Sequence, residues 1–134
     1  MSGVSIMLAD DNSAVLGQVK SALEKDYDIV AAVKDGDAVV GECLRLRPNV
    51  LILDISMGNV SGIDLARKLR SSGSPSKIVV LTIHEDYDFV NAAIGAGALA
   101  YVVKSRLSRD LIPSIEAVLA GKLFVSPSLL HQSH

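Results

Sequence analysis

Short apolar runs alternate along the chain with stretches in which apolar residues recur at helical spacing. The apolar runs cover residues 4–9, 28–33, 50–53, 77–81 and 99–103. Runs of this length and composition are typical of strands that are buried on both faces of a sheet. We therefore predict five strands, and the third of them stops on the carboxylate of Asp54.

The stretches between these runs predict helices over about residues 15–24, 38–47 and 86–94. A further helix is expected to start at Ser61 or Gly62 and to end in residues 71–75, and the last helix to run from Ser108 to Gly121. Residues 10–13 supply N-cap side chains for the first helix, Pro48 stops the second, and Ser108 is expected to cap the last. Strands that alternate with helices indicate an α/β fold with a parallel sheet and helices on both faces. The flavodoxin-like strand order 2-1-3-4-5 is the natural one for five such units.

Polar side chains follow four of the five predicted strands. Asp10 and Asp11 follow the first, Asp54 ends the third, Thr82 the fourth and Lys104 the fifth. In the order 2-1-3-4-5 the first and third strands flank the point where the connections reverse, so the three carboxylates should meet there. Such a cluster calls for a hard divalent cation, and Mg²⁺ leaves room for phosphate oxygens. Lys104 and the hydroxyl of Thr82 would favour a phosphoryl group beside Asp54.

Each of these residues also has an ordinary explanation when taken alone. The Asp10–Asp11 pair could be a helix cap, Thr82 an ordinary strand residue, and Lys104 a solvated loop lysine. Their joint occurrence at the same ends of four strands is much harder to attribute to chance.

Composition narrows the functional classes. The chain has 134 residues, of which 49% are hydrophobic, and a net charge of −2 without charge blocks. Because nucleic-acid binders usually show a basic face, we do not expect this segment by itself to bind DNA or RNA. The single cysteine, Cys43, rules out an internal disulfide and fits a small core side chain in a reducing compartment. With no signal-peptide core and no long apolar span, we expect a soluble cytoplasmic domain without membrane contact.

The arrangement of these polar residues resembles the receiver domain of two-component response regulators. The stretches LTIHED at 81–86 and AIGAGALAYVVK at 93–104 are most similar to the NarL/FixJ subfamily. The resemblance covers about residues 4–122, so we assign residues 1–122 to a receiver domain. Residues 123–134 then form a C-terminal tail that resembles the start of a linker to a helix-turn-helix DNA-binding domain missing from the sequence. A stand-alone receiver is the alternative.

The resemblance implies a phosphoacceptor domain and not an enzyme beyond slow self-phosphorylation and self-dephosphorylation. Asp54 would accept the phosphoryl group from the histidine of a sensor kinase. Asp11, Asp54 and the carbonyl of Ser56 would ligate Mg²⁺, with Asp10 helping through water. The phosphorylated form would pair into a homodimer and regulate transcription only through the missing DNA-binding domain.

The resemblance also implies a switch in which Thr82 and Lys104 engage the phosphoryl group and Tyr101 swings inward. This movement would alter the face made by the fourth helix, fifth strand and fifth helix. On sequence alone, a Tyr101 that is simply half-buried is an equal alternative. Ser56 and His84 stand where such domains tune the lifetime of the phosphoryl group, although an exposed His84 at a helix start is the favoured interpretation.

Three positions depart from the family pattern. Gly58 stands where the family often has Pro, which predicts a looser loop after Asp54. Ser105 follows Lys104 where many receivers have a proline with a cis peptide bond, so a cis bond is not expected here. Ala100 replaces a common glycine. None of the acids, Thr82 or Lys104 is affected.

Two rival functions remain open at this point. A haloacid-dehalogenase-type phosphohydrolase also uses an aspartate nucleophile, but its second Asp lies two residues later, where this chain has Ser56, and no cap domain is present. A pseudo-receiver that is never phosphorylated is disfavoured by the complete set of acids.

Overall fold

A six-stranded parallel sheet forms the centre of the computed structural model, which describes residues 3–127. Its strands lie in the order β2 (Asp28–Val33), β1 (Ser5–Ala9), β3 (Val50–Asp54), β6 (Lys77–Thr82), β7 (Ala100–Val103) and β8 (Phe124–Val125). All five pairings between these neighbours are parallel. The first five strands of this order confirm the predicted 2-1-3-4-5 topology, and β8 is an additional edge strand.

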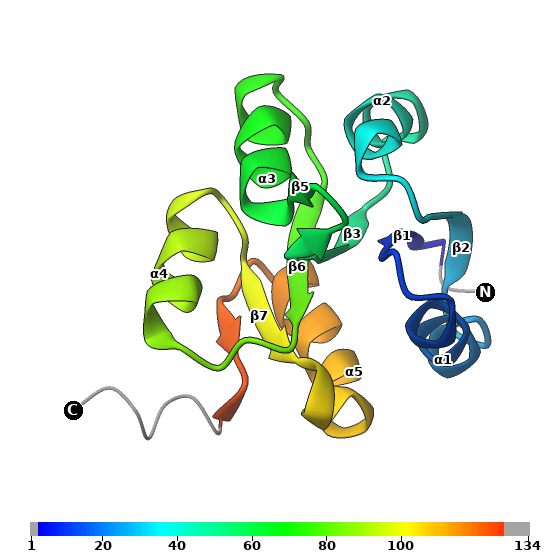
Figure 1. Cartoon of the computed structure of the whole chain (residues 1–134). Coiled ribbons are helices and arrows are strands. Elements are labelled where there is room, and N and C mark those ends of the chain that lie inside the picture. Colours follow the sequence, from blue (N-terminus) through cyan, green and yellow to red (C-terminus); the bar gives the residue numbers. More distant parts are fainter. Residues whose placement is uncertain (1–2, 128–134) are drawn as a thin grey trace.

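Helices cover both faces of the sheet, as predicted (Figure 1). One face carries α1 (Ser13–Leu23) and α5 (Leu107–Leu119), and the other carries α2 (Gly36–Leu46), α3 (Gly62–Ser71) and α4 (Tyr87–Gly95). A 3₁₀ turn, η1 (Lys104–Arg106), leads into α5. Within residues 3–127, none of the helices has the length and apolar character needed to cross a bilayer.

Alternate residues of each central strand feed two separate hydrophobic cores. In β3, Leu51 and Leu53 pack into the core beneath α2, α3 and α4. Val50 and Ile52 pack into the core beneath α1 and α5. Because β3 is buried on both faces along its whole length, it holds Asp54 at a fixed place on the rim of the sheet.

Helix starts agree with the predictions in part. Asn12 caps α1 by accepting hydrogen bonds from the backbone N–H groups of Ala14 and Val15, as residues 10–13 predicted. Helix α2 begins two residues earlier than expected because Asp35 accepts from the N–H of Asp37. The prediction that Ser108 caps the last helix is wrong: η1 runs directly into α5, so helical structure has already begun at Leu107.

The segment after Asp54 folds into a small hairpin that the sequence pattern did not predict. Strands β4 (Ser56–Met57) and β5 (Val60–Ser61) pair antiparallel, with Gly58 in the turn at φ +62°. Its base is tightly packed, because a side chain at Gly62 would collide with the carbonyl oxygen of Asp54. Gly58, where the family often has Pro, therefore lies in the turn of a paired hairpin, and the expectation of a looser loop stays a prediction.

A buried polar network ties the chain after α5 to the sheet. The Ser126 hydroxyl accepts a hydrogen bond from the Val103 N–H at 3.1 Å and donates one to Asp110 Oδ2 at 2.8 Å. Arg106 Nε also donates to Asp110 Oδ2, at 3.3 Å. Residues 124–126 therefore pack as part of the domain, although they lie in the stretch assigned to the tail. The assignment of a linker start there stays a prediction, and residues 128–134 lie outside the described residues.

We expect Ser126→Ala to lower the free energy of unfolding by about 1–3 kcal/mol, because it leaves the buried Val103 N–H without its partner and removes one of the two donors to Asp110 Oδ2. Urea denaturation measures the loss. Ser108→Ala is the matched control: Ser108 is exposed within α5 and caps nothing, so its effect should stay within about 0.5 kcal/mol. Equal losses for the two variants would contradict this account of the network.

Candidate functional site

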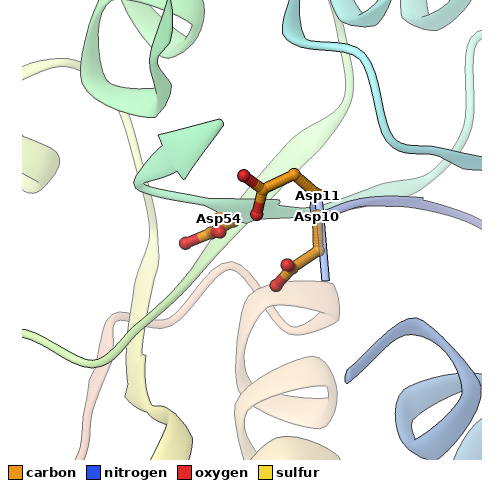
Figure 2. Close-up of side chains that lie close together, drawn as sticks. All are labelled: Asp10, Asp11 and Asp54. Atoms are coloured by element: carbon orange, nitrogen blue, oxygen red, sulfur yellow. The ribbon is translucent and has the colours of Figure 1, made fainter. Parts of the chain in front are cut away.

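Three carboxylates meet at the carboxyl ends of two neighbouring strands. Asp10 and Asp11 follow β1, Asp54 ends β3, and β1 pairs with β3 up to the last residue of β1, Ala9. One carboxylate oxygen from each aspartate lies within 4.8 Å of the other two (Figure 2). Asp10 and Asp54 are buried, whereas Asp11 is exposed. The convergence predicted from the strand ends is therefore present.

The ammonium group of Lys104 lies against the two buried carboxylates. Its Nζ is 2.9 Å from Asp10 Oδ2 and 3.4 Å from Asp54 Oδ2. Lys104 begins η1 just after β7, and its side chain reaches past the end of β6, the strand that separates β7 from β3. Among the described residues, this ammonium is the one polar partner found for Asp10 Oδ2.

Each of the three carboxylates accepts a hydrogen bond from a backbone N–H. Asp10 Oδ1 accepts from the Asn12 N–H at 2.8 Å, and Asp54 Oδ1 accepts from the Ser56 N–H at 3.2 Å. Asp11 differs, because its donor comes from a distant part of the chain: the Gly58 N–H lies 3.1 Å from Asp11 Oδ2. The loops after β1 and β3 thus orient the acids.

The charges in this pocket do not balance. Burial raises the pKa of Asp54 to about 6, with a smaller contribution from the charge of Asp10, against the opposing effects of the Ser56 N–H and Lys104. Burial by itself lowers the pKa of Lys104, but Asp10 and Asp54 outweigh that effect and the net pKa is raised. One ammonium therefore faces three carboxylates, which leaves the site short of positive charge.

The donor set fits a hard divalent cation. Carboxylate oxygens from Asp10, Asp11 and Asp54 surround a common point, and ions such as Mg²⁺ prefer oxygen ligands of this kind. The raised pKa of Asp54 also shows that the pocket favours added positive charge, which a cation would supply. The acidic cluster is consistent with the metal site of a receiver domain. Ser56, the other predicted ligand, begins β4 two residues after Asp54.

Thr82 and Tyr101 lie on the two strands beyond β3. Thr82 is the last residue of β6 and is fully buried, and its Oγ1 accepts from the His84 N–H at 3.0 Å. Tyr101 is also fully buried, and its hydroxyl donates to the carbonyl oxygen of His84 at 2.9 Å. Burial raises the pKa of Tyr101 to about 12, against an opposing effect of the Thr82 hydroxyl. A merely half-buried Tyr101 is therefore ruled out, and the ring already lies inward.

His84 packs more closely than the favoured interpretation allowed. Its ring stacks on that of Phe89, with centroids 4.3 Å apart and planes inclined by 14°. His84 is partly buried, and its backbone contacts both Thr82 and Tyr101. The sequence did not predict this stack. His84 lies before the start of α4 and Phe89 lies within it, so helical periodicity does not relate the two residues.

Sequence reasoning anticipated one further backbone feature and missed another. No peptide bond in residues 3–127 is cis, so the bond after Lys104 is trans, in line with the expectation from Ser105. The hydrogen bond from Gly58 to Asp11, however, was not foreseen. The sequence did show a glycine at position 58 where the family often has proline. A residue pattern does not reveal, however, in which direction the backbone N–H of that glycine points.

Comparison with known proteins identifies relatives over nearly the whole chain. The sequence profile of the response regulator receiver domain matches residues 6–116. The transcriptional regulatory protein DegU of Brevibacillus brevis is 29% identical over 130 residues, which cover 96% of this chain and 55% of DegU. The transcriptional regulatory protein DesR of Bacillus subtilis is 32% identical, with coverage of 95% of this chain and 64% of DesR. The chain thus spans 55% of the length of DegU and 64% of the length of DesR.

Solved structures share the fold. A LuxR-family two-component response regulator from Aurantimonas sp. SI85-9A1 has a TM-score of 0.89 at 29% identity, covering 95% of this chain and 92% of that one. The isolated REC domain of RcsB from Salmonella enterica serovar Typhimurium with the phosphomimetic BeF₃⁻ has a TM-score of 0.87 at 26% identity, covering 96% of each chain. A structure of RcsB dimers bound to DNA has a TM-score of 0.86 at 26% identity, covering 96% of this chain and 66% of that one.

In buffer with a metal chelator, we expect Asp54→Asn to raise the free energy of unfolding at neutral pH. Folding raises the pKa of Asp54 from 3.8 to about 6, so the unfolded chain releases this proton at a lower pH than the folded one. Wild-type stability should therefore fall as the pH rises from about 4 to about 6, and the variant escapes this loss. The gain should be about 1–2 kcal/mol above pH 6 and vanish below about pH 4.

Urea unfolding across this pH range measures the difference. Asp64→Asn is the matched control, because the Asp64 carboxylate is exposed and pairs only with Arg67 one helical turn away. A gain for Asp54→Asn that is the same at about pH 4 and at neutral pH would contradict a buried, charge-strained carboxylate.

Proposed function

This chain belongs to the family of response regulator receiver domains, and from that premise we propose that Asp54 accepts a phosphoryl group from a histidine of a sensor kinase. A receiver is a signalling domain and not a classical enzyme, which removes the phosphohydrolase alternative. One observation carries the proposal: the buried Asp54 carboxylate shares its pocket with two further acids and the Lys104 ammonium. The same complete set disfavours a pseudo-receiver.

Phosphoryl transfer to Asp54 depends mainly on the positions of the reacting groups and on neutralisation of the phosphoryl charge. A carboxylate oxygen of Asp54 attacks phosphorus, a P–O bond forms, and the P–N bond to the donor histidine breaks, leaving the electron pair on the imidazole. Lys104, which contacts Asp54 already, pairs with the phosphoryl oxygens. Asp11, Asp54 and the Ser56 carbonyl would hold Mg²⁺, with Asp10 acting through water. When bound, the cation neutralises the charge that gathers as the phosphoryl group arrives.

Thr82 and Tyr101 are proposed to relay the modification. The Thr82 hydroxyl accepts a hydrogen bond from the His84 N–H and remains able to donate its own proton. Donation to a phosphoryl oxygen on Asp54 would shift Thr82, and with it the His84 backbone that holds the Tyr101 hydroxyl. An added charge of about −1.5 to −2 at Asp54 is sufficient to bias such an element between two states.

We propose that the domain works in the cytoplasm and that its phosphorylation changes the transcription of target genes. DegU and DesR are transcriptional regulatory proteins and are longer than this chain, which supports a DNA-binding domain beyond residue 134 in the parent protein. The structure of RcsB dimers on DNA supports homodimer formation, which we propose to follow phosphorylation in this chain. DNA contact would come only from that further domain.

Incubation with acetyl phosphate and Mg²⁺ should label the wild-type chain on one carboxylate, as measured by intact mass. Asp54→Asn should lose the label and a chelator should prevent it, because the nucleophile or the balancing charge is then absent. Asp64→Asn changes an exposed carboxylate outside the acidic pocket and should label like wild type. Equal labelling of Asp54→Asn would assign the phosphoacceptor elsewhere.

Mg²⁺ and beryllofluoride should shift the wild-type chain from a monomer or weak dimer to a stable dimer in sedimentation. Asp54→Asn lacks the carboxylate to which beryllofluoride attaches, so its mass should not change. An unchanged wild-type mass would refute activation-linked pairing.

A further inference from the structure

The turn of the β4–β5 hairpin presents a backbone donor to the acidic cluster. Gly58 adopts φ +62°, a left-handed conformation that glycine enters without steric cost. In that conformation its N–H lies 3.1 Å from Asp11 Oδ2. The two residues are 47 positions apart, so the bond joins the loop after β3 to the loop after β1.

This contact depends on the residue that departs from the family pattern. A proline at position 58 would have no N–H to donate, and its ring fixes φ near −65°, far from the +62° seen here. The hydrogen bond to Asp11 is therefore available to this chain because glycine replaces proline.

Asp11 is the acid that most needs such a partner. Asp10 and Asp54 are buried and paired with Lys104, whereas Asp11 is exposed. Within residues 3–127, its carboxylate takes part in no ion pair, and the Gly58 N–H is its hydrogen-bond donor. An exposed side chain without a partner would sample several rotamers, so this bond selects one of them.

The bond leaves one oxygen of Asp11 for another ligand. Oδ2 accepts from Gly58. Figure 2 shows the Asp11 carboxylate turned toward the side of Asp54, with one of its two oxygens pointing toward Asp54 and Asp10. Since one ligand atom from each acid lies within 4.8 Å of the others, Asp11 is held in an orientation that completes the cluster.

Close packing fixes the hairpin that carries the donor. The Gly62 N–H donates to the carbonyl oxygen of Ile55 at 2.7 Å, which closes the base of the hairpin. A Cβ at Gly36, in the first turn of α2, would lie 2.8 Å from the Cβ of Val60. The hairpin therefore lies directly against α2 and the end of β3, which limits its freedom to move the Gly58 N–H.

We propose that the Gly58 N–H is a positioning donor that sets Asp11 for a hard divalent cation. Hydrogen-bonded partners of ligating carboxylates commonly contribute 10–100-fold to metal affinity. Gly58 acts through Asp11 and does not itself touch the ion. The inference rests on the metal-binding part of the proposed function and needs no phosphoryl transfer.

Calorimetric titration of the 134-residue chain with Mg²⁺ alone tests it. Gly58→Pro should bind Mg²⁺ about 10–100-fold more weakly than wild type. Gly58→Asn keeps the N–H and tolerates positive φ, so it should bind within about threefold of wild type. Gly58→Ala keeps the N–H but strains the turn and should fall between them. Equal affinity for wild type and Gly58→Pro would overturn the proposal.

Amide hydrogen exchange in metal-free buffer gives a second measurement that does not depend on the fold of a proline variant. The Gly58 amide should exchange more slowly in wild type than in Asp11→Ala, which lacks the acceptor. Equal exchange rates would overturn the positioning role while leaving Asp54 as the phosphoacceptor. A wild-type chain that binds no Mg²⁺ would overturn both this inference and the proposed metal site.

Discussion

Three carboxylates and one ammonium group lie together at the rim of the sheet. This excess of negative charge constrains the structure around the site. Burial and a like-charged neighbour raise the pKa of Asp54 to about 6, so its ionised form is held at a cost to folding stability. Natural proteins keep such strained groups where function needs them, and the rest of the fold must compensate. Here the compensation comes from an aliphatic core on each face of the sheet.

The same core explains how the acids keep their places. Strand β3 is fully buried, and β1 pairs with it in register, so neither strand can slide without moving its apolar residues out of both cores. The end of β3 is fixed further by the close approach of Gly62 to the carbonyl oxygen of Asp54. Precise placement of the carboxylates is thus a consequence of packing, and the hydrogen bonds from Asn12, Ser56 and Gly58 refine it.

The sequence predicted those parts of the molecule that follow from a repeating pattern. Long apolar runs such as 50–53 identified the central strands, and parallel strands deliver their last residues to one edge, which brought Asp10, Asp11 and Asp54 together. The two-residue strands β4, β5 and β8 are too short to show any period. The prediction that Ser108 caps the last helix was wrong because serine is a common N-cap residue, and its residue type alone does not show where a helix begins. The Gly58 donor depends on a backbone torsion that no residue pattern encodes.

Strand β7 links the acidic site to the chain that follows α5. Tyr101 and Lys104 lie in and just after this strand, and both contact groups around the site. On its outer edge, the Tyr101 carbonyl accepts from the Ser126 N–H at 2.9 Å, and the Val103 N–H donates to the Ser126 hydroxyl at 3.1 Å. Ser126 therefore bonds to the backbone of Tyr101, the proposed switch residue, and to that of Val103, the residue before Lys104. Because these bonds are buried, a shift of β7 cannot occur without moving Ser126 or breaking its contacts. A change at Asp54 that displaces Tyr101 or Lys104 would thus reach Ser126 through β7, and the hydrogen bond from Ser126 to Asp110 would carry it on to α5.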